Sequence, residues 1–234
     1  MMAVPKYILN DSVYHGGQDA QYSFADDKTE SDPVRAGWVS RRWDTAVSAR
    51  FHQLLFELAK RFDGKIEGLN LPESSIEVGT SGNFFPPGFT FALYRDAIKS
   101  NMLVLKQVYL QSVTIQYANF FPGPANYLNE LFDYAKQIKA GMGGPDIKVN
   151  RKFQMENSYP LIRDMHGYAA TGVAVQEANY SVVNDRTGKQ VTVAGIFDFA
   201  NDYLRLNYIF WCTEEPYYSN EVLSMLRKLK TEQR

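Results

Sequence analysis

The chain has 234 residues, 45% of them hydrophobic, which is enough to bury a large core within one domain. Its 25 basic and 26 acidic residues nearly cancel, so we expect neither nucleic acid nor an anionic membrane as a partner. Cys212 is the only cysteine, which excludes an internal disulfide framework and a cysteine-based zinc cluster. We predict no metal and no cofactor.

The localisation prediction depends on the start of the chain. No stretch approaches the ~20 apolar residues of a membrane span, and the first residues lack a basic region followed by an apolar signal core. We therefore expect a cytoplasmic protein, or a secreted one if an upstream segment is missing. The chain begins almost directly with the predicted strand 5–10, so it stays open whether an upstream part is missing.

Short apolar strands alternate with amphipathic helices along the chain, a pattern typical of βα units around a parallel sheet. The predicted strands are 5–10, 65–71, 112–117, 138–142, 171–176 and 205–211. The predicted helices are 44–62, 89–110, 125–137, 189–203 and 219–231. We expect one domain over residues 1–234. A long loop insertion is predicted at 11–43, with an acidic middle that is either disordered or functional.

Polar side chains follow the first two strands that carry chemistry. Asn70 and Glu73 lie near the carboxyl end of strand 65–71, where a carboxylate is placed as a catalytic acid would be in a barrel. Glu73 could equally cap the next segment or pair with a surface base. Gln116 and Asn119 follow strand 112–117, and their neutral amides suit a hydroxyl-rich ligand.

The later strands end in similar groups. Asp146 follows a turn of glycines that permits close approach of the backbone. Strand 171–176 brings three polar residues, and strand 205–211 ends in a tryptophan that is followed by a tyrosine. These are Gln176, Glu177, Asn179, Trp211 and Tyr217. Because side chains alternate along a strand, either Glu177 faces the axis or Gln176 does and Glu177 lies on the rim.

Several kinds of catalytic site are excluded by spacing. The three histidines, His15, His52 and His166, show no pairing typical of a metal site or a hydrolytic triad, and no G-x-S-x-G motif occurs. Acid–base chemistry by carboxylates is what remains.

The order of motifs NLPES, TIQYANF, GMGGPD, AVQEANY and YIFWC resembles the later strands of the retaining (β/α)8-barrel glycoside hydrolases. The resemblance covers residues 3–231. It implies an α/β fold of TIM type, with strand 65–71 as the fourth strand and strand 171–176 as the seventh. It further implies that Glu73 is the acid/base, that Glu177 is the nucleophile, and that Trp211 is the platform for the sugar.

The resemblance makes strand 65–71 the fourth, but only strand 5–10 precedes it. About six βα units are therefore visible, and two N-terminal strands of the eight-stranded plan are missing. A barrel of this kind has unpaired edges. Either the chain is a fragment, a partner such as a second copy covers the edges, or the sheet is open.

The predicted function is retaining hydrolysis of a glycosidic bond by Glu73 and Glu177. The predicted ligand is an oligosaccharide or another small molecule, bound by Asn70, Gln116, Asn119, Asp146, Gln176, Asn179, Trp211 and Tyr217. The alternatives are a non-catalytic saccharide-binding or small-molecule-binding protein, and a truncated barrel remnant that assembles with a partner.

Overall fold

The computed structural model describes residues 3–232, and these divide into two compact units. Of the described residues, the first unit comprises 3–68, 74–112 and 121–134, and the second comprises 69–73, 113–120 and 135–232. No helix of the described residues is long and apolar enough to span a membrane. The expectation of one domain stays a prediction.

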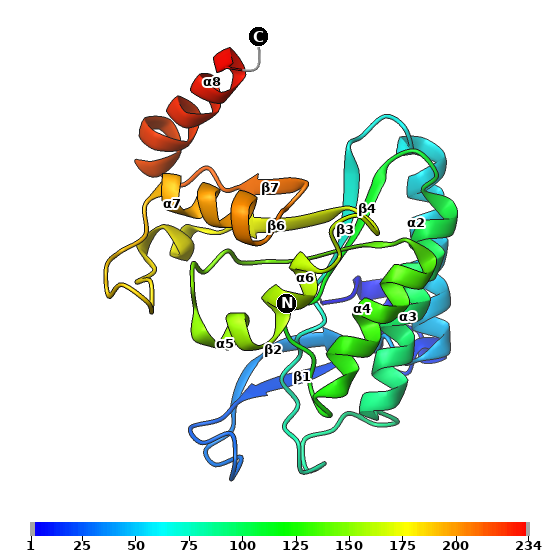
Figure 1. Cartoon of the computed structure of the whole chain (residues 1–234). Coiled ribbons are helices and arrows are strands. Elements are labelled where there is room, and N and C mark those ends of the chain that lie inside the picture. The colour runs from blue at the N-terminus through cyan, green and yellow to red at the C-terminus, as the bar shows by residue number, and fades with distance from the viewer. Residues whose placement is uncertain (1–2, 233–234) are drawn as a thin grey trace. The chain divides into compact units, whose positions relative to one another are not determined.

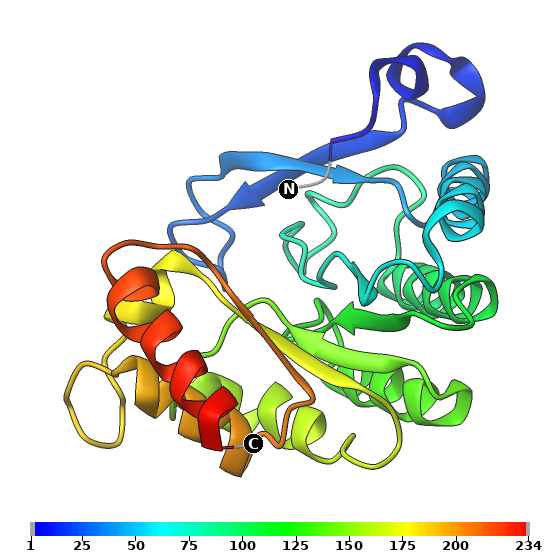
Figure 2. The same ribbon diagram turned by 90° about the horizontal axis from the view of Figure 1, so that it is seen from above.

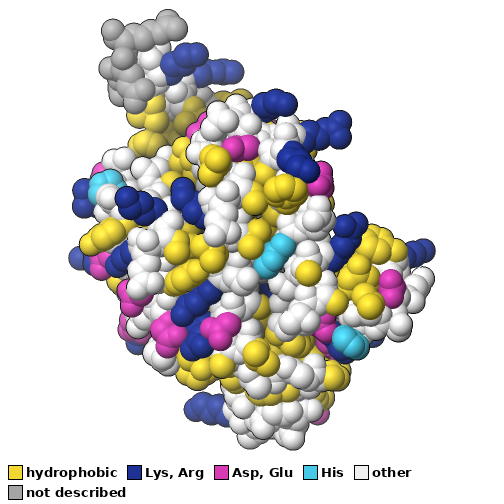
Figure 3. Space-filling model, turned by 90° about the vertical axis from the view of Figure 1, so that its right-hand side faces the viewer, with side chains coloured by type: hydrophobic (Ala, Val, Ile, Leu, Met, Phe, Trp, Pro, Cys, Tyr) yellow, Lys and Arg dark blue, Asp and Glu magenta, His cyan; other side chains and the backbone are white. Residues whose placement is uncertain are grey.

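The first unit is built on a helix pair and a hairpin. Helices α2 (Thr45–Phe62) and α3 (Phe91–Val108) lie side by side in Figure 1 and confirm the predicted helices 44–62 and 89–110. Asp44 caps α2 by accepting hydrogen bonds from the backbone N–H groups of Ala46 and Val47. Apolar side chains on the side of the molecule where these helices lie form separate groups among charged ones (Figure 3).

Two predictions for the N-terminal region are wrong. Residues 5–10 form no strand, because Pro5 starts a short helix, α1 (Lys6–Asn10), which is followed by the 3-10 turn η1 (Ser12–Tyr14). The segment 11–43 is not a structureless loop: β1 (Gln18–Ser23) and β2 (Val34–Ser40) pair in an antiparallel hairpin. β1 has only Ala20 and Tyr22 as apolar residues, and Gly37 interrupts the alternation of β2. The apolar pattern of each strand is therefore too short to identify the hairpin in the sequence.

The main sheet has five parallel strands in the order β3-β4-β5-β6-β7, curled through 214° as an open half-barrel. The strands are β3 (Gly68–Leu71), β4 (Val113–Tyr117), β5 (Gly141–Gly144), β6 (Thr171–Val175) and β7 (Tyr208–Trp211). Helices alternate with the strands, so the α/β fold class and the incomplete TIM-type barrel are confirmed. Five strands take part rather than six, because residues 5–10 are helical.

The helices of the second unit follow the strands in chain order. The sequence pattern predicted α4 (Asn126–Ile138), whose last residues belong to this unit, and α7 (Val193–Asp198) with the π-turn η3 (Phe199–Tyr203). It also predicted the final helix, η4 (Tyr218–Val222) and α8 (Leu223–Glu232). It did not predict α5 (Lys152–Glu156), α6 (Ser158–Arg163) or the 3-10 turn η2 (Glu177–Ser181). Figure 2 shows α6 and α7 on one side of the sheet.

The strands differ in how deeply they are buried. All four residues of β5 are buried, and a Cβ added at Gly143 would lie 1.7 Å from the carbonyl oxygen of Gly172 on β6. The glycine is therefore needed for the close approach of these two strands. The residues of β7 are only half-buried, and within the sheet β3 and β7 each pair with one neighbour. That a second copy covers these edges stays a prediction.

Candidate functional site

The carboxyl ends of the five strands meet at one edge of the sheet, because the strands are parallel. We call this edge the rim. All ten residues predicted to form the site belong to the second unit and lie at or next to the carboxyl ends of β3 to β7. The rim is therefore the place where the predicted residues gather, although their individual roles differ.

Gln116 holds the first part of the rim together. Its side chain is 2% exposed, and its Nε2 donates hydrogen bonds to the backbone oxygens of Pro72 (2.7 Å) and Tyr117 (2.8 Å). The bond to Pro72 anchors the residue directly before Glu73. The Glu73 side chain is half-buried. Gln116 thus positions the segment that carries Glu73, and its amide nitrogen is already used within the protein.

Asn70 and Tyr117 form a second link between β3 and β4. The Asn70 Nδ2 donates to the Tyr117 hydroxyl over 2.9 Å. Burial raises the pKa of Tyr117 to about 12, and the hydrogen bond from Asn70 opposes this shift. Tyr117 therefore stays a neutral phenol at ordinary pH.

A network of polar side chains joins the ends of β5 and β6. Asn179 is fully buried, its Oδ1 accepts from the backbone N–H of Gln176 (2.8 Å), and its Nδ2 donates to Asp146 Oδ1 (3.0 Å). Asp146 also pairs with Lys148, whose Nζ lies 3.4 Å from Oδ2. The Gln176 Nε2 donates to the backbone oxygen of Pro145 (3.0 Å). Asp146 and Asn179 are therefore occupied in shaping the rim.

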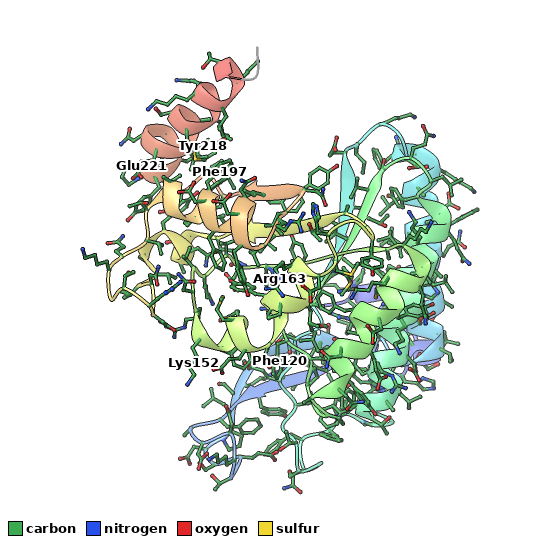
Figure 4. All side chains as sticks on the ribbon, in the orientation of Figure 1. Phe120, Lys152, Arg163, Phe197, Tyr218 and Glu221 are labelled. Atoms are coloured by element: carbon green, nitrogen blue, oxygen red, sulfur yellow. The ribbon has the colours of Figure 1, made fainter. Side chains whose placement is uncertain are left out.

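Asn119 is the predicted amide that is not used in this way. Its Oδ1 is buried and accepts no hydrogen bond from the described residues. A buried acceptor without a donor costs about 1–3 kcal/mol, so Asn119 differs from the other predicted amides in not being held through its oxygen. Next to it in the sequence, the exposed ring of Phe120, labelled in Figure 4, contacts the exposed ring of Phe153 on α5, with centroids 6.2 Å apart.

The position of Glu177 follows from where β6 ends. The strand stops at Val175 and η2 begins at Glu177, so the alternation of a strand no longer decides which way this side chain faces. Glu177 is exposed and lines a pocket of about 540 Å³. The pocket is formed by Gln176, Glu177, Ala178, Ser181, Glu214 and Tyr217.

Stacked aromatic rings support this pocket. The rings of Tyr180 and Tyr217 lie parallel, with centroids 4.8 Å apart and 7° between their planes. Trp211 stacks on Tyr180 at 6.5 Å, and the Tyr180 hydroxyl donates to the backbone oxygen of Cys212. Burial is the main cause of a raised pKa for Tyr180. The predicted Trp211 thus acts on the pocket through the two tyrosines, and Tyr217 lines it directly.

The pocket contains two polar residues that were not among the predicted site residues, Ser181 and Glu214. Glu73 is not among the residues that line it. The sequence signal for Glu214 was its place three residues after Trp211, directly beyond the carboxyl end of β7. Ser181 had no such signal, because η2 was not expected.

The described residues contain no group of three or more His, Cys, Asp or Glu side chains that could hold a metal ion. No family model, no curated protein and no solved structure matches this chain.

Proposed function

We propose that the second unit binds a saccharide in the pocket at the carboxyl ends of β6 and β7. The observation that carries this proposal is the composition of the pocket: carboxylate, amide and hydroxyl groups beside a tyrosine supported by stacked rings. Polar groups of this kind pair with sugar hydroxyls, and an aromatic ring offers a flat surface for a sugar ring. Ligand sites in open α/β sheets form at this end of the strands.

The test is to measure by isothermal titration calorimetry how tightly each member of a panel of oligosaccharides binds the full chain. We expect Tyr217→Ala to weaken binding of a ligand from this panel by about tenfold, since it removes the aromatic wall. Tyr168→Ala is the matched control, because Tyr168 is an exposed tyrosine of the same unit that does not line the pocket. Equal losses from both substitutions, or no binding of any saccharide, would contradict the proposal.

Hydrolysis of a glycosidic bond is a second candidate, favoured by the anchoring of Glu73. The Gln116 side chain fixes the backbone directly before Glu73, which suits a group that must be held in place for catalysis. In this mechanism Glu73 donates a proton to the leaving oxygen, Glu177 attacks the anomeric carbon, and Glu73 then activates water. Retention requires carboxyl groups ~5–5.5 Å apart, whereas roughly 6.5–9.5 Å would mean inversion.

Aryl glycosides that release a coloured phenol test this candidate. We expect Glu73→Gln and Glu177→Gln each to lower turnover by about 10²–10⁴-fold while the affinity for neutral sugars stays largely intact. Turnover that survives both substitutions would exclude hydrolysis by these two residues and leave saccharide binding as the function.

A further inference from the structure

The pocket at the ends of β6 and β7 is strongly asymmetric in charge. Two of its six residues are glutamates, Glu177 and Glu214, and none is lysine, arginine or histidine. Within residues 3–232, neither of the two carboxylates makes a hydrogen bond or a salt bridge. The pocket therefore holds two negative charges that the described residues do not compensate.

This arrangement differs from the other acidic groups of the rim. Asp146 also lies at the rim, but its carboxylate is paired with Lys148 and accepts from Asn179. Glutamates in contact with water are ionised at neutral pH. Two such charges in one concave site attract a cation and repel an anion, and the ring of Tyr217 adds to the attraction.

A metal ion does not suit these residues. The described residues contain no cluster of three or more carboxylate, imidazole or thiol groups that could hold one. The pocket also has a volume of about 540 Å³, which is far larger than a single ion and falls in the range of small-molecule sites. An organic cation fits both the charge and the size.

We propose that the pocket selects saccharides that carry a free amine, with the ammonium group placed between Glu177 and Glu214. The hydroxyl of Ser181 and the side chain of Tyr217 then contact the rest of the sugar. Saccharides with carboxylate groups are repelled. This inference rests on the proposed saccharide binding and specifies its substrate class.

The expected selectivity is moderate because the pocket is open to solvent. Exposed ion pairs contribute little individually, so the two carboxylates together should favour an amino sugar over its neutral counterpart by roughly tenfold. The preference should be larger at ~0.01 M ionic strength, where the Debye length is about 30 Å, and should nearly vanish at ~1 M.

The experiment compares three oligosaccharides of equal length by calorimetry with the full chain: one of glucosamine, one of N-acetylglucosamine and one of glucuronate. A buffer of about pH 6 keeps most of the amines protonated, since an amine next to electron-withdrawing groups, such as an α-amino group, titrates near ~8. We expect the glucosamine oligomer to bind roughly tenfold more tightly than the N-acetylated one, and the glucuronate oligomer to bind most weakly.

Charge variants identify the cause of the preference. We expect Glu177→Gln combined with Glu214→Gln to reduce the ratio of the two affinities, glucosamine oligomer over N-acetylated oligomer, from about tenfold to about one, whatever the change in the affinity for the N-acetylated oligomer itself. Glu221→Gln is the matched control, because Glu221 is an exposed glutamate of η4, labelled in Figure 4, that does not line the pocket. This control should keep the tenfold preference.

The outcomes separate the two proposals. If the neutral oligomer binds as tightly as the glucosamine oligomer, the amine inference is wrong and saccharide binding stands. If the preference persists in the double variant, or is lost equally in Glu221→Gln, Glu177 and Glu214 are not its source and the inference is also wrong. If none of the three oligomers binds, both proposals fail.

Discussion

Two glutamates of this chain, one in each unit, differ in nearly every respect. Glu30 in the first unit is 7% exposed, and its carboxylate accepts from the backbone N–H groups of Thr80 (2.5 Å) and Ser81 (2.8 Å) and from both hydroxyls. Glu177 in the second unit is exposed, and its carboxylate makes no hydrogen bond or salt bridge with the described residues. A carboxylate with several donors holds a structure together, whereas one without them is available to a ligand.

The surroundings of Glu30 confirm its structural role. Its backbone has a φ of 52°, which is uncommon for a residue with a side chain. A Cβ added at Gly79 would lie only 2.6 Å from the Glu30 Oε1, so the partner loop has a glycine where the carboxylate approaches. The acidic middle of segment 11–43, residues 25–33, was expected to be either disordered or functional. The Glu30 side chain holds it against the loop of residues 79–82.

The largest effect is expected from removing the structural carboxylate. Glu30→Ala leaves the N–H groups of Thr80 and Ser81 without their acceptor, so the segment 25–33 should open. We expect trypsin to cleave after the exposed Lys28 at least about tenfold faster than in the wild type, as measured by mass spectrometry over time. Asp27→Ala, an exposed carboxylate in the same segment, is the control, and equal acceleration in both variants would contradict this role of Glu30.

A smaller effect, on the stability of the fold, is expected when the pH is lowered. The pKa of Glu30 is lowered from its ordinary value of 4.5, chiefly by the hydrogen bond from the Ser81 hydroxyl and then by the N–H groups of Thr80 and Ser81. A lowered pKa in the folded state means that the ionised carboxylate stabilises the fold above about pH 4.5, and that this contribution is lost as the pH falls through the folded-state value.

Urea denaturation of the wild type and Glu30→Gln measures this contribution. The wild type should be more stable at about pH 7, and the difference between the two proteins should shrink as the pH falls below about 4.5. A difference that stays constant down to about pH 2 would show that ionisation of Glu30 does not contribute to stability.

The smallest effect on stability is expected from the pocket. Glu177→Gln and Glu214→Gln remove carboxylates that have no partner among the described residues, so the free energy of unfolding should change by no more than about 0.5 kcal/mol. Urea denaturation measures this change too. A loss of more than about 2 kcal/mol would show that these groups hold the fold together, as Glu30 does.

The sequence also predicted the amides of the rim, but their roles differ from those expected. Gln116 and Asn179 were predicted to bind a ligand because neutral amides follow two apolar strands. In the structure their amide groups hydrogen-bond other rim residues, and Asn119 retains a buried oxygen without a donor from the described residues. The sequence indicates that an amide lies at the end of a strand. It does not indicate the hydrogen-bond partners of that amide, because these come from neighbouring strands that are distant along the chain.

Local physics was sufficient for part of the fold, but not for the hairpin β1–β2 or for helices α5 and α6. The sequence predicts α2, α3 and four of the five parallel strands from their apolar periodicity, and it predicts β5 from its glycines. These patterns depend only on residues a few positions apart. Only the tertiary structure decided which carboxylates are paired and that Glu177 shares a pocket with Glu214, 37 residues further along the chain. Pairing and pocket formation depend on distances between distant segments, which periodicity and composition do not contain.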